Sequence, residues 1–231
     1  MNVAAPARDP MLGGFYTVSE AARLLRIENK QRIYRWLDSN KAAMPVLKRD
    51  YAPIDHAQEM SFWDLIEVRF VEHFRSQGLT LQFLRKVAEK ARKEFKTAHP
   101  FALSNATFLT DRRRIFQQTA EEEGERKTHD LLSGQYEMYD AIEALLAKGI
   151  AFHPTTALAT EWRPLETECP HVIVNPHYAY GHPVIGKTRI PTSAIFRSWR
   201  AEGDRSRVAS WFGINRTNVD EAIEFELRLI N

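Results

Sequence analysis

Two short helix signals separated by a break near the N-terminus constrain the fold more than any other feature of the chain. Thr17 is followed three residues later by Glu20, the pattern of a reciprocal capping box that starts a helix. An apolar face over residues 21–25 follows, and it stops at 27–29. A second helix is predicted from the helical spacing of three apolar side chains, Ile33, Trp36 and Leu37. Two short helices joined by a turn of a few residues indicate a helix-turn-helix.

The second of these helices opens a basic segment. Residues 30–49 carry six cationic side chains and one acidic side chain, although the formal net charge of the whole chain is only +2. A recognition helix presents its first residues to base edges in the major groove of DNA, so we expect base contacts there from Lys30, Gln31, Arg32 and Arg35. Cations in the following connection are expected to hold phosphates, namely Lys41, Lys48 and Arg49. The alternative interpretation is a solvated helical face without a ligand.

The remaining pattern predicts a mainly α (α+β) fold. We expect a flexible tail over 1–14, a winged helix-turn-helix domain over 15–96, a small β-rich middle region over 97–170 and a helical domain over 171–231. Two proline-flanked extended pieces within 42–60 would form the wing. Further helices of the winged domain are expected to begin at Ser61 and Thr80, because each can cap the apolar helical pattern that follows it.

The middle region is predicted as β-rich because short apolar and β-branched runs alternate there with polar residues. Strands are expected at 101–103, 107–109, 115–116, 131–132, 150–152 and 158–162, with a charged loop at 121–127 and a helix at 139–148.

In the last region a strand is expected at 172–174, and helices at 192–201, at 205–212 and from 215 or 217 to 229. The last two form a second helix-turn-helix-like pattern, which could contact DNA, a partner protein or a second subunit. Tryptophans fall at the spacing of helical core positions, at Trp36, Trp63, Trp199 and Trp211.

Composition excludes several classes of protein. No apolar run approaches the ~20 residues that a membrane helix needs, and the N-terminus lacks the apolar segment of a signal peptide, so cytoplasmic location and no membrane partner are expected. The single cysteine, Cys169, allows no internal disulfide. It lies near His171, His177 and His182, whose spacing fits no standard metal site. We therefore expect no metal, no cofactor and no enzymatic activity, since no local nucleophile motif is present either.

Residues 181–188 match the G-x-x-x-x-G-K-[ST] signature of a phosphate-binding loop letter for letter. Such a loop leaves a strand directly and enters a helix. Here six residues separate the motif from the apolar run 172–174, and Pro191 would clash in the first turns of the required helix. The residues around the motif therefore disfavour a nucleotide-binding enzyme. That function remains the third of the alternatives considered for the chain.

Two regions resemble known families. Residues 15–96 resemble the DNA-binding domain of the MerR family, above all over 16–25, 62–67 and 74–81, although the long connection 42–60 departs from that family. Residues 171–231 resemble the domain of unknown function 433, through the segments 181–185 and 188–192 and the helices after Gly203. Lys187 stands where that family has a glycine.

This pairing is similar to antitoxins of the VapB type, which are encoded beside PIN-like ribonuclease toxins. The resemblance implies a homodimer that binds double-stranded operator DNA as an autorepressor and also binds and neutralises a PIN-like toxin. Arg189 is the candidate for an inhibitory side chain inserted into the toxin's acidic site, and a role in fixing the local turn is the alternative. The alternative function is a MerR-like transcriptional regulator without a toxin partner.

Overall fold

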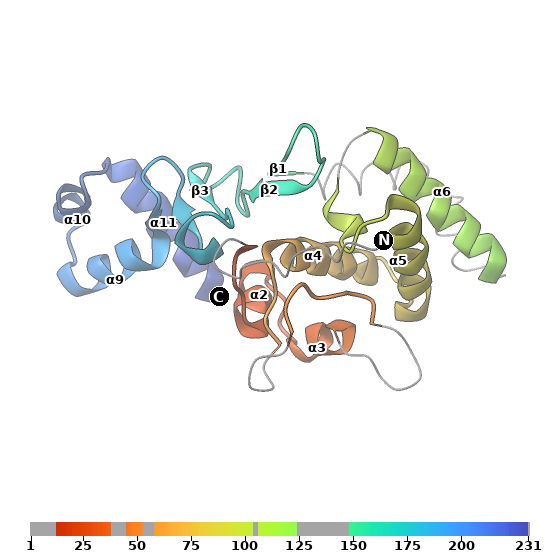
Figure 1. Cartoon of the computed structure of the whole chain (residues 1–231). Coiled ribbons are helices and arrows are strands. Elements are labelled where there is room, and N and C mark those ends of the chain that lie inside the picture. Colours follow the sequence, from red (N-terminus) through yellow and green to blue (C-terminus); the bar gives the residue numbers. More distant parts are fainter. Residues whose placement is uncertain (1–12, 38–44, 53–57, 104–105, 124–147, 231) are drawn as a thin grey trace.

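The computed structural model describes residues 13–37, 45–52, 58–103, 106–123 and 148–230. The fold is mainly α with small antiparallel sheets, as predicted (Figure 1). Its first helices are α2 (Val18–Leu25), α3 (Gln31–Leu37), α4 (Phe62–Ser76), α5 (Leu81–Phe95), the short 3-10 helix η1 (Pro100–Ala102) and α6 (Ala106–Glu123). A 3-10 helix, η2 (Ala179–Gly181), precedes the last three helices, α9 (Thr192–Glu202), α10 (Arg205–Phe212) and α11 (Arg216–Ile230). None of the described helices is long and apolar enough to cross a bilayer.

Side-chain caps explain why two of these helices begin where the sequence predicts. At α2 the Thr17 N–H donates to Glu20 Oε2 at 2.8 Å, and the Glu20 N–H donates to Thr17 Oγ1 at 3.2 Å. Ser61 and Asp64 form the same reciprocal box at the start of α4, with distances of 2.8 and 3.1 Å. Both boxes satisfy backbone donors that the first turn of a helix leaves without partners.

Two small antiparallel sheets lie between the helical parts. Strand β1 (Ile150–Phe152) pairs with β2 (Ala159–Trp162), and β3 (Val172–Ile173), β4 (Val184–Ile185) and β5 (Ile190–Pro191) follow one another in a three-stranded sheet. An isolated bridge between Trp162 and Val174 joins the two sheets. The strands predicted at 150–152, 158–162 and 172–174 are therefore confirmed.

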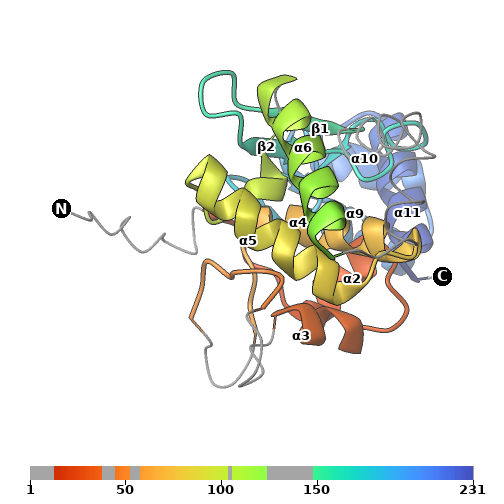
Figure 2. The same ribbon diagram turned by 90° about the vertical axis from the view of Figure 1, so that its right-hand side faces the viewer.

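The strands predicted at 101–103, 107–109 and 115–116 are wrong. Residues 100–102 form η1, and the other two segments lie within α6, which also includes the start of the predicted charged loop. Along α6 the buried side chains recur at helical spacing, at Ile115, Phe116, Thr119 and Ala120. The ring of Phe116 lies 4.9 Å from that of Phe74 and 5.8 Å from that of Phe83, so α6 packs beside α4 and α5 (Figure 2). The predicted elements at 131–132 and 139–148 fall outside the described residues, except for residue 148.

The predicted wing is not found in the described part of the connection between α3 and α4. Residues 45–52 and 58–60 contain no hairpin, and their one bridge pairs Met60 with Tyr16 instead. Val46 and Leu47 are fully buried, and the Leu47 N–H donates to the Trp36 carbonyl at 3.1 Å. Arg92 of α5 holds the same segment through the Val46 carbonyl. Apolar docking against α3 and α5 thus replaces strand pairing there.

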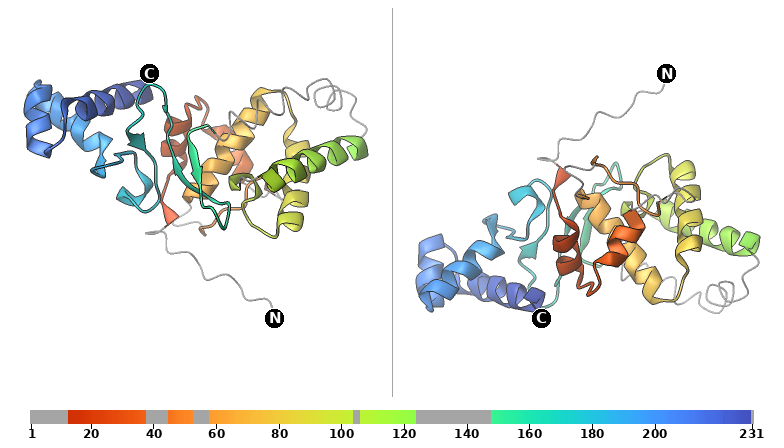
Figure 3. Two further views of the ribbon diagram at one scale, coloured as in Figure 1. Left: turned by 90° about the horizontal axis from the view of Figure 1, so that it is seen from above. Right: turned by 90° about the horizontal axis from the view of Figure 1, so that it is seen from below.

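The helices α9–α11 and the helix α6 lie at opposite ends of the molecule, with α2 and α4 between them (Figure 3). Direct contacts join the N-terminal helices to the C-terminal part. The Tyr16 hydroxyl donates to the Gly181 carbonyl at 2.7 Å. Glu226 of α11 pairs with Arg23 of α2 at 2.6 Å and accepts a 2.5 Å bond from the buried Thr192 hydroxyl. A cavity of about 180 Å³ lies at the same junction, lined by residues of α2, α4 and α11.

Candidate nucleic-acid interface

The helices α2 and α3 form a helix-turn-helix whose inner face is apolar. Arg26 ends α2 in the left-handed region, at φ 55°, and the next N–H, of Ile27, donates back to the Ala22 carbonyl at 2.8 Å. Ile33 is fully buried and Trp36 nearly so, which fixes the rotation of α3 about its axis. The side chains on the opposite face of α3 are therefore directed outward.

Three of the predicted base-contacting residues are exposed at the start and along the outer face of α3. Gln31 and Arg35 are four residues apart, so they lie one helical turn from each other on the same face. Lys30, just before the helix, donates from Nζ to Ser19 Oγ at 3.1 Å. No ion pair of Arg35 is found in the described parts of the chain. These side chains form a polar, cationic strip that a groove of DNA could contact.

Arg32 lies in a different environment from the other three. Its Nη1 donates to Glu72 Oε1 of α4 at 3.0 Å, and its Nη2 lies 2.9 Å from Glu72 Oε2. The guanidinium also lies 5.5 Å from the centre of the Trp36 ring. Burial raises the pKa of Glu72, and the charge of Arg32 partly offsets that rise. A base contact by Arg32 would require this ion pair to open.

The predicted phosphate contacts follow α3 in the chain. Lys48 is exposed, and it follows Leu47, which is bonded to Trp36, so Lys48 lies beside the C-terminal end of α3. Arg49 is half-buried, and its Nη1 has no hydrogen-bond partner among the described residues. Lys41 falls outside the described residues. The structure therefore places Lys48 next to the exposed strip of α3.

The segment resembling a phosphate-binding loop is a tight β-turn region. Gly186 to Arg189 connect β4 to β5, so the motif is followed by a strand and not by a helix. The N–H groups of Thr188 and Arg189 both donate to the Ile185 carbonyl, at 3.1 and 2.7 Å. Because these donors are already used within the turn, they cannot wrap a phosphate as the motif requires.

Arg189 and Trp211 are both exposed side chains of the C-terminal region. Arg189 adopts φ 60°, and its guanidinium lies 4.4 Å from the centre of the Tyr178 ring. Trp211 of α10 is 60% exposed, so its prediction as a core residue is wrong. The helical spacing of Trp211 was correct, but α10 turns that side chain away from α9 and α11, whereas Trp36 is buried as expected.

Comparisons with known proteins bear on this architecture. Residues 172–225, from β3 into α11, match a family model. The family is DUF433, a protein family of unknown function. The resemblance inferred from the sequence for the C-terminal region is thereby confirmed over those residues. Gly181, Arg189 and Trp211 all belong to this DUF433 segment.

A curated sequence and a solved structure from Mycobacterium tuberculosis are each similar over nearly the whole chain. One, from strain ATCC 25618 / H37Rv, is named "Putative antitoxin VapB45" and is 24% identical over 226 residues, which cover 90% of this chain and 92% of that protein. The crystal structure of Rv2018 has a TM-score of 0.70 and 22% identity, covering 94% of this chain and 98% of that one. The similarity to Rv2018 therefore shows a shared fold over nearly the whole chain.

The sequence did not predict which residues pair with Arg32 and His171. Glu72, the partner of Arg32, is 40 residues away in the chain, and no local pattern connects the two. Among Cys169, His171, His177 and His182, whose spacing fits no standard metal site, His171 pairs with a glutamate. Its Nδ1 lies 2.7 Å from Glu221 Oε1 of α11. Among the described residues, the group of side chains that could hold a metal ion is another one, Asp50, Asp64 and His99. The residues of this group are spread over 49 positions of the chain, from Asp50 to His99, so no local spacing connects them.

Proposed function

We propose that this protein is the antitoxin of a type II toxin–antitoxin pair, which neutralises a PIN-like ribonuclease and represses its own operator as a homodimer. The observation that carries the proposal is the match to a protein named as an antitoxin, which spans 90% of this chain and 92% of that protein. A match of that extent includes the N-terminal helices and the DUF433 segment together. It therefore favours an antitoxin over a regulator that shares only the helix-turn-helix.

The surface of α3 supports the DNA-binding half of this proposal. Gln31 and Arg35 lie on one exposed face, with Lys30 at its start and Lys48 beside its end. Arginine and glutamine read guanine and adenine through paired hydrogen bonds, and lysines neutralise phosphates. Two such helices related by a two-fold axis would contact two half-sites of an operator one helical turn apart.

Two exposed side chains of the DUF433 segment support the toxin-binding half. Arg189 is stacked on Tyr178, and no carboxylate pairs with it in the described parts of the chain, so its guanidinium N–H groups can bind acidic groups of a ribonuclease site. Trp211 offers a large exposed aromatic surface, the kind of side chain that dominates protein interfaces. We therefore assign toxin binding to this end of the molecule and DNA binding to α3.

The decisive experiment expresses the small protein encoded beside this chain, alone and together with it. Growth arrest by that protein alone, rescue by co-expression and a complex that survives gel filtration are the expected results. A harmless neighbour that forms no complex would contradict the antitoxin proposal and leave a DNA-binding regulator.

Matched variants separate the two halves of the proposal. Trp211→Ala should weaken rescue and co-purification while leaving operator binding unchanged. Arg35→Ala should weaken operator binding while leaving rescue and co-purification unchanged. If both variants rescue growth and bind the toxin like the wild type, Trp211 is not at the toxin interface.

A further inference from the structure

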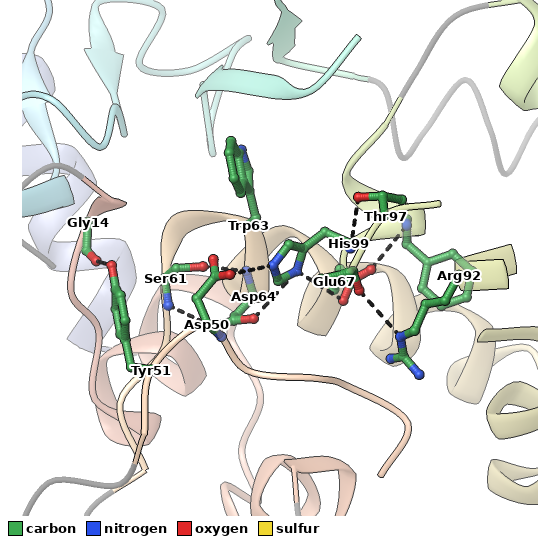
Figure 4. A network of polar contacts seen from close by, with 12 residues as sticks. Gly14, Asp50, Tyr51, Ser61, Trp63, Asp64, Glu67, Arg92, Thr97 and His99 are labelled. Carbon is green, nitrogen blue, oxygen red and sulfur yellow. Dashed lines mark hydrogen bonds and ion pairs between the residues drawn. The ribbon is translucent and has the colours of Figure 1, made fainter. Parts of the chain in front are cut away.

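A buried cluster of three carboxylates and one imidazole lies between α4, the connection that precedes it and the turn before η1 (Figure 4). Asp50 comes from the connection between α3 and α4, Asp64 and Glu67 from α4, and His99 from the turn before η1. The side chains of Asp64 and Glu67 are 0% exposed, that of His99 is 3% exposed and that of Asp50 is 15% exposed. Three carboxylates and one imidazole in such a place carry excess negative charge, which is costly to bury. The guanidinium of Arg92, which lies near Glu67, offsets part of that charge.

Each of the two helical carboxylates has one oxygen fixed by the backbone. Asp64 Oδ2 accepts hydrogen bonds from the N–H groups of Ser61 at 2.8 Å and Asp50 at 3.2 Å. Glu67 Oε1 accepts one from the Phe101 N–H at 3.1 Å. The other oxygens, Asp64 Oδ1 and Glu67 Oε2, are buried and have no hydrogen-bond partner.

The two unpartnered oxygens lie near the same nitrogen atom. His99 Nδ1 is 3.6 Å from Asp64 Oδ1 and 3.5 Å from Glu67 Oε2, and it too is buried without a hydrogen-bond partner. The other ring nitrogen, Nε2, lies 2.8 Å from Asp50 Oδ1. Two carboxylate oxygens thus lie within 3.6 Å of one buried imidazole nitrogen, while Asp50 contacts the other nitrogen of the ring.

The electrostatic environment favours a positive charge at this position. Burial raises the pKa of Asp64 to about 6, although the charge of His99 opposes that rise. Burial by itself would lower the pKa of His99, but the bond to Asp50, a long contact to Glu67 and the charges of Glu67 and Asp64 raise it to about 10. A proton on His99 Nδ1 stabilises the two carboxylates only in part, because Nδ1 lies farther from both oxygens than in a typical hydrogen bond.

We propose that His99 Nδ1, Asp64 Oδ1 and Glu67 Oε2 bind a divalent transition-metal ion, with Zn²⁺ the best fit, and that Asp50 orients the imidazole. A cation about 2.0–2.2 Å from a nitrogen and an oxygen holds these two atoms about 3.3 Å apart in tetrahedral geometry. The two nitrogen–oxygen separations, 3.5 and 3.6 Å, exceed this value by only about 0.3 Å or less. A ligating histidine that donates its other N–H to a carboxylate is the usual outer arrangement of such sites.

The donor set argues for a transition metal over calcium or magnesium. Ca²⁺ and Mg²⁺ take oxygen ligands, whereas an imidazole nitrogen with carboxylates suits Zn²⁺ and its neighbours in the first transition series. A bound ion would also tie Asp50 to α4. Since Asp50 directly follows Lys48 and Arg49, the metal would fix the segment that carries both cations.

Metal binding can be measured on the full-length, tag-free chain without DNA or toxin. The protein is stripped with a chelator and titrated with Zn²⁺ by calorimetry, and with Co²⁺ by visible absorption. We expect one ion per chain and a raised melting temperature, because a ligand that binds only the folded state stabilises it.

Two variants locate the site. His99→Gln and the isosteric Glu67→Gln should each weaken Zn²⁺ binding by about 10-fold or more, the loss typical of a removed ligand or its orienting partner. The control is His171→Gln. His171 pairs with Glu221 outside the cluster, so this variant should bind Zn²⁺ like the wild type.

The proposal is overturned if the folded wild-type protein binds neither ion, which would leave a purely proton-based ion cluster. It is equally overturned if folded His99→Gln binds Zn²⁺ as tightly as the wild type. Should His99→Gln not fold, Glu67→Gln and the Co²⁺ spectrum of the wild type decide. Because no readout involves DNA or toxin, the result is independent of the proposed antitoxin function.

Discussion

At the scale of single residues, neighbours in α3 differ in what they can offer a ligand. Arg35 is exposed on the outer face, whereas Arg32 is held by Glu72 and lies over Trp36. The sequence places both arginines at the start of a basic helix and cannot distinguish them. The ion pair to α4 distinguishes them, because a guanidinium already paired with a carboxylate must lose that pair before it binds DNA.

Arg35→Ala should weaken operator binding by about 1–3 kcal/mol and relax sequence preference at the contacted base. The physical reason is the loss of a paired hydrogen bond to a base edge from an arginine that has no competing ion pair in the described structure. Fluorescence anisotropy on the operator and on point-substituted operators measures both effects. Arg200→Ala, an exposed arginine of α9, is the matched control. Unchanged affinity and selectivity in Arg35→Ala would remove α3 from the base contacts.

Glu72→Gln should tighten DNA binding by up to about 5-fold, because it releases Arg32 and removes a negative charge facing the DNA. The limit follows from the ~1 kcal/mol or less that a half-exposed ion pair contributes. The same anisotropy titration, repeated at two salt concentrations, measures the gain. Weaker binding in Glu72→Gln would mean that the pair serves to hold Arg32 in its DNA-binding orientation.

At the scale of elements, the aromatic packing around α4 decides what the middle of the chain becomes. The ring of Phe70 stacks on that of Phe101 at 4.0 Å, and Phe74 and Phe83 both contact Phe116. Short runs such as 115–116 have no strong local preference, so the face that α4 and α5 offer selects the helix. A strand there would direct Phe116 and Thr119 to opposite faces, but both are buried.

Phe116→Ala should lower the free energy of unfolding by about 3–5 kcal/mol, as expected for a large aromatic side chain removed from a filled core. Urea denaturation followed by far-UV circular dichroism measures the change. Gln118→Ala, two residues away on the exposed face of α6, should alter stability by less than about 0.5 kcal/mol. Equal effects of the two substitutions would contradict the packing of α6 against α4 and α5.

At the scale of the whole molecule, the N-terminal helices and the DUF433 segment are joined through close backbone contacts. Gly181 adopts φ 89°, and a Cβ atom on it would lie 2.3 Å from Tyr16 Oη. The same glycine accepts the Tyr16 hydroxyl bond through its carbonyl. The first glycine of the phosphate-loop-like motif is therefore explained by this contact, without any nucleotide.

Gly181→Ala should destabilise the protein by more than Gly203→Ala, since both glycines have positive φ but a Cβ on Gly203 meets nothing within 4 Å. Gly203→Ala reports the backbone strain alone, about 1–2 kcal/mol. The excess in Gly181→Ala reports the steric conflict with Tyr16. Differential scanning calorimetry without added nucleotide measures both. Equal losses would mean that the junction between the two parts yields freely to an added methyl group.

Local signals in the sequence correctly predicted helices α2 to α5 and α9 to α11, together with three strand positions. Capping boxes such as Thr17 with Glu20, and apolar side chains at helical spacing, act within a few residues, so they can be read without knowing the fold. The resemblance of residues 172–225 to DUF433 could also be recognised directly, because its motif lies within one continuous segment.

Tertiary structure alone decided the helical state of α6, the exposure of Trp211 and the pairing of Arg32 with Glu72. It also brought together Asp50, Asp64, Glu67 and His99, which are separated by up to 49 residues in the chain. Each of these features depends on contacts between elements that are distant in the sequence. Local propensity carries no information about such contacts, because burial and charge pairing exist only after the elements have packed.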